Sequence, residues 1–118
     1  MRVSIPCMGD DGLKERISSH FGRAPYFAIF DIETEDLRFV PNESEHMGGS
    51  GKPPRIMDEE DVDIMLTANL GRRAIALFEE IGIKVYCGAE GTIQETLDQW
   101  EEGKLEEATK NKACEQGH

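Results

Sequence analysis

Short apolar runs alternate with polar turns and amphipathic stretches along this chain, a pattern typical of an α/β domain. The apolar runs predict five strands, at residues 2–6, 26–32, 37–40, 62–66 and 83–87. The run at 26–32 is almost wholly apolar, which indicates a strand that is buried on both faces. Because only a short polar turn follows it, the second and third strands are expected to form an antiparallel hairpin.

Two longer stretches carry apolar residues at helical spacing. The first helix is expected to begin with Asn69 as its N-cap and to end at Gly82. The second is expected to follow Thr92, which can form a capping box with Glu95. Shorter helical turns are predicted at residues 13–17 and 55–60.

The order of these elements limits the topology of the sheet. The fourth strand, the first long helix and the fifth strand make a parallel crossover, which is right-handed in almost all proteins. We therefore predict a five-strand mixed sheet of order 3-2-1-4-5, with strand 2 antiparallel to the rest and helices on both faces. One domain is expected over residues 1–105, followed by a flexible polar tail at 106–118.

Composition narrows the function classes. The 118 residues carry a formal net charge of −11, which argues against a nucleic-acid partner because phosphate contacts need clustered Lys and Arg. No apolar run is long enough to cross a membrane, and the N-terminus lacks the basic and apolar regions of a signal peptide. Three widely spaced cysteines do not predict a disulfide framework. We therefore expect a cytoplasmic protein with no membrane partner.

In the predicted sheet, the loops of greatest chemical interest meet at one edge. The carboxyl ends of strands 1, 4 and 5 share this edge with the loops at 18–25 and 41–54, and open α/β sheets bind ligands there. Cys7, placed in a loop after strand 1, is the expected reactive thiol. No pair has the spacing of a closed zinc site. The soft or borderline metal ligands expected near the edge are Cys7, Met8, His20, His46, Met47 and Cys87.

The same edge is expected to attract an anion. Two helices begin there, so their unpaired N–H groups and positive dipole ends would face the crevice. Arg23, Arg72 and Arg73 add cationic donors, although at least one of the last two is expected to lie over its own helix surface. An anionic metal–sulfur cluster, held by one or two direct ligands and by N–H donors, fits this set of groups.

Several short motifs follow one another along the chain in an order that can be compared with known families. Residues 18–27, S-S-H-F-G-R-A-P-Y-F, follow a strand that ends in I-P. Further motifs are Asn42 with the Gly-rich segment after it, V-D-I-M-L-T-A-N-L-G-R-R-A, G-I-K-V-Y and G-T-I-Q-E-T-L. Over residues 1 to about 105 they resemble the dinitrogenase iron–molybdenum cofactor biosynthesis family. The resemblance implies a ribonuclease H-like fold and a carrier or scaffold role for an iron–molybdenum or related metal–sulfur cluster, or its precursor, during cofactor assembly.

The resemblance carries His20 over as the main direct ligand, because this residue belongs to the family's H-F-G motif. Cys7 and His46 are metal-ligand candidates from the residue inventory alone, and from the residues alone His20 can equally be a solvated loop histidine. The cofactor-binding residues expected at the edge are Ser19, His20, Phe21, Gly22, Arg23, Asn69, Gly71, Arg72, Gly88 and Thr92.

Catalysis is not expected. A nuclease of the ribonuclease H type needs carboxylates on its central strands, and strand 1 at residues 2–6 has none. No catalytic triad can be assembled without free choice among many residues. The competing function is a metal-free protein-interaction module that works with an ATPase or a redox partner. The partner considered for a carrier is a cofactor-assembly protein or an ATPase.

Overall fold

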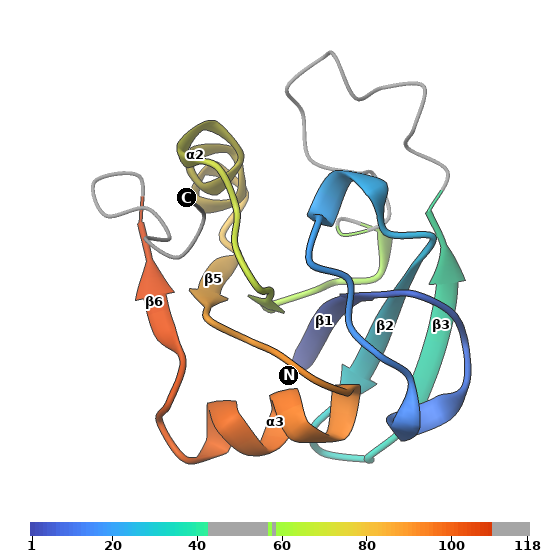
Figure 1. The fold of residues 1–118 in the computed structure, drawn as a ribbon. Helices are drawn as coiled ribbons and strands as arrows, with labels where there is room; N and C mark the ends of the chain where they lie inside the picture. The colour runs from blue at the N-terminus through green and yellow to red at the C-terminus, as the bar shows by residue number, and fades with distance from the viewer. Residues whose placement is uncertain (43–56, 58, 110–118) are drawn as a thin grey trace.

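The computed structural model describes residues 1–42, 57 and 59–109. Within them, a mixed sheet carries one α-helix on each face (Figure 1). Its strands are β1 (Arg2–Cys7), β2 (Tyr26–Asp31), β3 (Leu37–Pro41), β4 (Ile64–Leu66), β5 (Lys84–Cys87) and β6 (Glu106–Ala108). The helices are α2 (Arg72–Glu80) and α3 (Ile93–Glu101), and two short 3-10 turns are η1 (Gly12–Lys14) and η2 (Phe21–Arg23).

The strands lie in the order β3-β2-β1-β4-β5-β6. Strand β1 is antiparallel to β2 and parallel to β4, which is in turn parallel to β5. Strand β3 is antiparallel to β2, so β2 runs antiparallel to the other four predicted strands, β1, β3, β4 and β5. The predicted order 3-2-1-4-5 and the direction of strand 2 are therefore confirmed, while the ribonuclease H-like assignment stays a prediction.

The sheet has one strand more than predicted. Residues 106–108, expected to belong to a flexible tail, form β6 and pair antiparallel with β5, with Val85 opposite Ala108 and Cys87 opposite Glu106. Leu105 and Ala108 are buried. This short edge strand has two exposed glutamates and no apolar periodicity, so only its pairing with a distant strand defines it. Residues 110–118 of the predicted tail lie outside the described residues.

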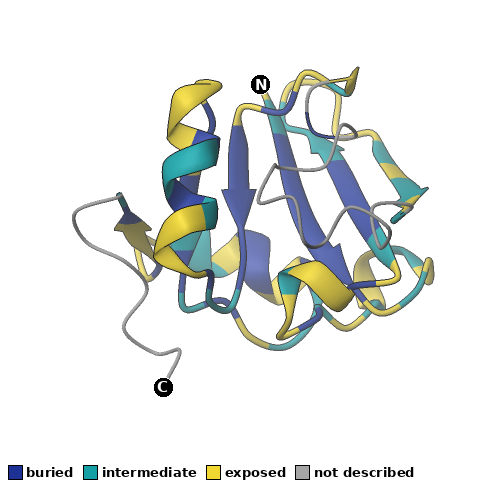
Figure 2. Cartoon of the chain, turned by 90° about the horizontal axis from the view of Figure 1, so that it is seen from above, coloured by how far each residue is buried: buried dark blue, intermediate teal, exposed yellow. Residues whose placement is uncertain are grey.

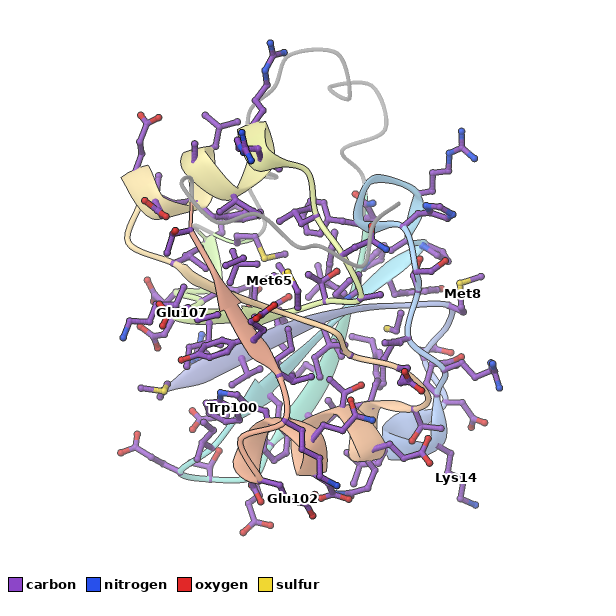
Figure 3. The ribbon with its side chains drawn as sticks, turned by 60° about the vertical axis from the view of Figure 1, so that its left-hand side comes forward. Met8, Lys14, Met65, Trp100, Glu102 and Glu107 are labelled. Carbon is purple, nitrogen blue, oxygen red and sulfur yellow. The ribbon has the colours of Figure 1, made fainter. Side chains whose placement is uncertain are left out.

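The two helices bury separate sets of apolar side chains on opposite faces of the sheet. Strand β4 shows this division, because Met65 packs on the α2 side whereas Ile64 and Leu66 pack on the α3 side. Figure 2 shows the strands buried at the centre and the helices exposed along their outer sides. Figure 3 shows Met65 and Trp100, a residue of α3, on opposite sides of the sheet. The prediction of helices on both faces is confirmed.

Two of the three predicted helix ends agree with the structure. Gly82 follows α2 with a φ of +84°, a conformation that glycine adopts without strain. Thr92 and Glu95 form the predicted capping box at α3. The N-cap of α2 is Gly71, so the prediction of Asn69 as the cap was wrong. The predicted turn at 13–17 is shorter, as η1, and the one at 55–60 falls mostly outside the described residues.

One buried side chain predicts a stabilising substitution. Ser4 has no accessible surface, and its hydroxyl has no hydrogen-bond partner among the described residues. In the register of the sheet it lies beside Ile29 and Met65, both apolar. A buried, unpaired hydroxyl costs about 1–3 kcal/mol, so Ser4→Ala should raise the free energy of unfolding by about 1 kcal/mol in chemical denaturation.

Thr67→Val is the matched control for this prediction. The Thr67 side chain is as deeply buried, but its hydroxyl donates a hydrogen bond to the carbonyl of Asn69 (3.3 Å). Its removal should lower the free energy of unfolding by about 1 kcal/mol. Equal losses of stability in the two variants would contradict the prediction.

Candidate functional site

The segments that follow β1, β4 and β5 are hydrogen-bonded to one another at the carboxyl edge of the sheet. The N–H of Gly88 donates to the carbonyl of Ala68 (3.0 Å), and the N–H of Ala89 donates to Thr67 (3.2 Å). The N–H of Ile17 in turn donates to the carbonyl of Gly91 (3.0 Å). These contacts join the three segments into one surface, as the predicted topology requires.

The chain between η1 and η2 is fixed at this edge on both sides. On one side, the N–H of Met8 donates to the backbone carbonyl of Arg16 (2.9 Å), and the N–H of Ser18 donates to the carbonyl of Pro6 (2.8 Å). On the other side, the N–H of Ile93 in α3 donates to the carbonyl of Glu15 (2.9 Å). The loop that carries His20 therefore rises from a hydrogen-bonded base.

The far side of the His20 loop is anchored by side chains. The ring of Phe21 packs on Phe27 in β2 (centroids 5.2 Å apart) and meets Phe78 of α2 edge-on at 5.5 Å. The amide group of Asn42 donates from Nδ2 to the carbonyl of Ala24 (2.7 Å). Between these anchors, the segment from Ser19 to Arg23 is exposed except for the half-buried Phe21. The loop thus has a fixed frame and an accessible tip that carries His20.

The N-terminus of α2 lies at the same edge and has no side-chain cap. Gly71, its N-cap, supplies none, and the first turn contains no acidic residue. Arg72 and Arg73 occupy the first two helical positions instead, and both are exposed. Cations are unfavourable beside the positive end of a helix dipole, so the two arginines do not stabilise this turn.

The described arginines divide into two groups by position. Arg2 and Arg38, at the opposite end of the sheet, form ion pairs with Glu60, and Arg2 also pairs with Asp31. The arginines at the carboxyl edge have no ion pair among the described residues: Arg16, Arg23, Arg72 and Arg73. These four arginines carry positive charge without an ion pair in the described part of the carboxyl edge, in a chain of net charge −11.

The N-terminus of α3 has its first N–H groups bonded within the fold. The N–H of Thr92 donates to Oε1 of Glu95 (2.9 Å), and the N–H of Glu95 donates to Oγ1 of Thr92 (3.2 Å). The N–H of Ile93 is used by Glu15, and α3 covers the other face of the sheet. The expectation of free N–H groups at both helices was therefore wrong for α3, while a cofactor-binding role of Thr92 stays a prediction.

Cys7 is not the surface thiol that the sequence suggested. It is the last residue of β1 and has no accessible surface, and its Sγ donates to the carbonyl of Gly9 (3.3 Å). Burial raises the pKa of this thiol to about 12, so it stays protonated at neutral pH, and its role as a metal ligand stays a prediction. The thioether of the next residue, Met8, is 55% exposed at the end of β1 (Figure 3).

The remaining predicted residues have different positions. Gly88 is half-buried, with a φ of +98°, and shapes the turn after β5. Asn69 is half-buried and accepts a hydrogen bond through its backbone carbonyl. His46 lies outside the described residues. In the part of the chain that the structure describes, no three His, Cys, Asp or Glu side chains are grouped to hold a metal ion. A metal bound by these residues would therefore need further ligands that they do not supply, such as the sulfides of a cluster.

Comparison with known proteins identifies the family. The sequence model of the dinitrogenase iron–molybdenum cofactor family matches residues 1–103. The chain belongs to this family. Family membership confirms the resemblance seen in the H-F-G segment, and β6 lies just beyond the matched residues. No helix in the described part is long and apolar enough to span a membrane.

Several known proteins are similar to this chain over most of its length. The crystal structure of PH0822 is 38% identical with a TM-score of 0.74, covering 91% of this chain and 96% of its own. The NMR structure of TM1290 from Thermotoga is 33% identical, with a TM-score of 0.73 and coverage of 90% and 91%. MJ0580 of Methanocaldococcus jannaschii, an uncharacterized protein, is 29% identical over 90% of both chains. The apo orange protein of Desulfovibrio gigas is 22% identical, with a TM-score of 0.76 over 91% and 92%, which shows a common fold.

Two contributors to this edge were missed in the sequence. Arg16 reaches it because an isolated bridge pairs this residue with Thr92, a contact across the fold with no local signal. Ser18 is buried under the loop, where its hydroxyl bonds to the backbone of His20. The Ser-x-His spacing is compatible with such a local bond and could have indicated it.

The buried thiol predicts a test of its reactivity. At about pH 8 a thiol with so high a pKa should react with dithionitrobenzoate only after the chain opens. The parent chain and Cys7→Ala should therefore release equal absorbance when native, and the parent should release one thiol equivalent more in denaturant. Because the folded pKa is raised, the contribution of Cys7 to stability is complete below its unfolded pKa and is lost from about pH 9 towards 12. A faster native reaction of the parent would contradict the burial.

Proposed function

We propose that this protein is a cytoplasmic carrier or scaffold for an anionic metal–sulfur cluster, of the iron–molybdenum or a related type, or for its precursor. The observation that carries the proposal is made at the carboxyl edge of the sheet, which holds the exposed His20, the uncapped N-terminus of α2 and four arginines without an ion pair among the described residues. Membership of the dinitrogenase iron–molybdenum cofactor family supports this cargo. The carrier would receive or deliver the cluster through a cofactor-assembly protein or an ATPase.

The chemistry of the edge suits binding and release. Arginine side chains and backbone N–H groups donate charge-assisted hydrogen bonds to the sulfide or oxo groups of an anion. Neutral imidazole can add one direct bond to iron or copper. Because the groups are exposed, each interaction is moderate and depends on salt, so the cargo can be passed on. The proposal assigns no catalytic step to the chain.

His20→Ala tests the direct ligand. The protein, purified under anaerobic conditions, is incubated with tetrathiomolybdate or with an iron–sulfur donor and then desalted. The parent chain should retain a visible absorption band and the corresponding metal, whereas His20→Ala should lose most of both. An exposed loop side chain contributes little to folding, so the melting temperature should be nearly unchanged.

Full retention by His20→Ala would remove this residue from the proposed ligand set. A bare protein spectrum from the parent under every loading condition would contradict the carrier function. That second outcome would favour the metal-free interaction module.

The arginines at α2 predict a separate loss of affinity. Replacing both Arg72 and Arg73 by Gln removes two exposed charges, each worth up to about 1 kcal/mol, so the tetrathiomolybdate affinity should fall about tenfold. The difference from the parent should shrink as salt is added, because salt screens exposed charges. Lys84→Gln is the control, since this exposed cation lies at the amino end of β5, away from the site. Equal effects of the double variant and the control would show that only net charge matters.

A further inference from the structure

The hydroxyl of Ser18 forms two hydrogen bonds, and both are to the backbone of His20. Oγ of Ser18 donates to the carbonyl of His20 (3.0 Å), and the N–H of His20 donates back to the same oxygen (3.2 Å). Ser18 is only 4% exposed, whereas its neighbour Ser19 is exposed and makes no side-chain hydrogen bond among the described residues. The two serines of the motif therefore have different roles.

These bonds connect the exposed histidine to the centre of the sheet. The N–H of Ser18 donates to Pro6 in β1 (2.8 Å), so the serine itself cannot shift without breaking a bond to a buried strand. The His20 carbonyl also accepts from the N–H of Arg23 (3.1 Å), the bond that closes η2. The backbone of His20 is thus held at its N–H and, by two donors, at its carbonyl. Its side chain is exposed.

This arrangement differs from a bond that merely stabilises the fold. The Ser18 hydroxyl joins no two distant elements, because both of its bonds stay within three consecutive residues. What it fixes is the backbone conformation of His20, extended at φ −124° and ψ 107°, and hence the direction in which the imidazole leaves the chain. Groups that orient a ligand side chain raise affinity by lowering the ordering cost of binding.

We propose that Ser18 is the positioning residue of His20 and that Ser19 is not part of the site. The inference rests on the proposed function, in which His20 is the direct ligand to the cargo. The Ser18 hydroxyl is the group that holds the His20 backbone, and with it the imidazole, in the orientation for binding. Ser18 itself touches no cargo.

The test compares Ser18→Ala, Ser18→Thr and Ser19→Ala in the full chain. Ser18→Ala should weaken the binding of tetrathiomolybdate about tenfold in an anaerobic absorption titration, as loss of an orienting partner commonly does. Ser18→Thr keeps the hydroxyl and should restore most of the affinity, and Ser19→Ala should bind like the parent. Amide hydrogen exchange at His20, measured without ligand, should accelerate in Ser18→Ala alone.

The two proposals can fail separately. Normal binding by Ser18→Ala, while His20→Ala has lost it, would overturn the positioning role and leave the carrier function intact. If His20→Ala binds normally, the ligand assignment fails, and unchanged exchange at His20 in Ser18→Ala would then overturn the positioning role as well. Global unfolding of Ser18→Ala, or failure of Ser18→Thr to restore binding, would show that the serine is structural.

Discussion

Strand β1 determines where the rest of the domain lies, because it is hydrogen-bonded to β2 along one side and to β4 along the other. Val3 sits between Phe30 and Ile64, so this pairing joins an antiparallel hairpin to a parallel crossover. A shift of one residue would exchange the faces of its side chains and expose one of the two cores. The same strand receives the Ser18 N–H at Pro6, and so the base of the His20 loop depends on it too.

The two ends of the sheet use their charges differently. At the amino end, the guanidinium of Arg2 donates to the carbonyl of Glu60 (2.7 Å) and lies 4.0 Å from the carboxylate of Asp31. The backbone N–H of Glu33, helped by Arg2, holds the pKa of Asp31 below its usual value, so that carboxylate stays charged. The two arginines at this end are thus paired with carboxylates. At the carboxyl edge, the arginines have no ion pair among the described residues.

The His20 loop combines a fixed frame with an exposed tip. Its base is hydrogen-bonded to β1 and α3, and Phe21 attaches its middle to the core beneath α2. A loop held in this way loses little conformational freedom when it binds a ligand. Exposure at the tip also means that the bound groups are not sealed from solvent, which suits the proposed transfer of a cargo better than its permanent storage.

What the sequence by itself determined about this protein is local. The capping box of Thr92 and Glu95 and the end of α2 at Gly82 were predictable because each involves residues no more than a turn apart. The order of five strands followed from short connections and the handedness of the crossover. The order of several motifs, among them the H-F-G segment, predicted the family, and the family match over residues 1–103 confirms it, while the site at this segment stays a prediction.

Only the tertiary structure decided which groups are available at that edge. It buried Cys7 beneath the loop, brought Arg16 beside Thr92, and used the first N–H groups of α3 for bonds within the fold. It also paired residues 106–108 with β5. In each case the outcome depends on contacts between segments far apart in the chain. Burial and pairing of this kind have no local signal, since the same residues would stay exposed and unpaired if their partners were elsewhere.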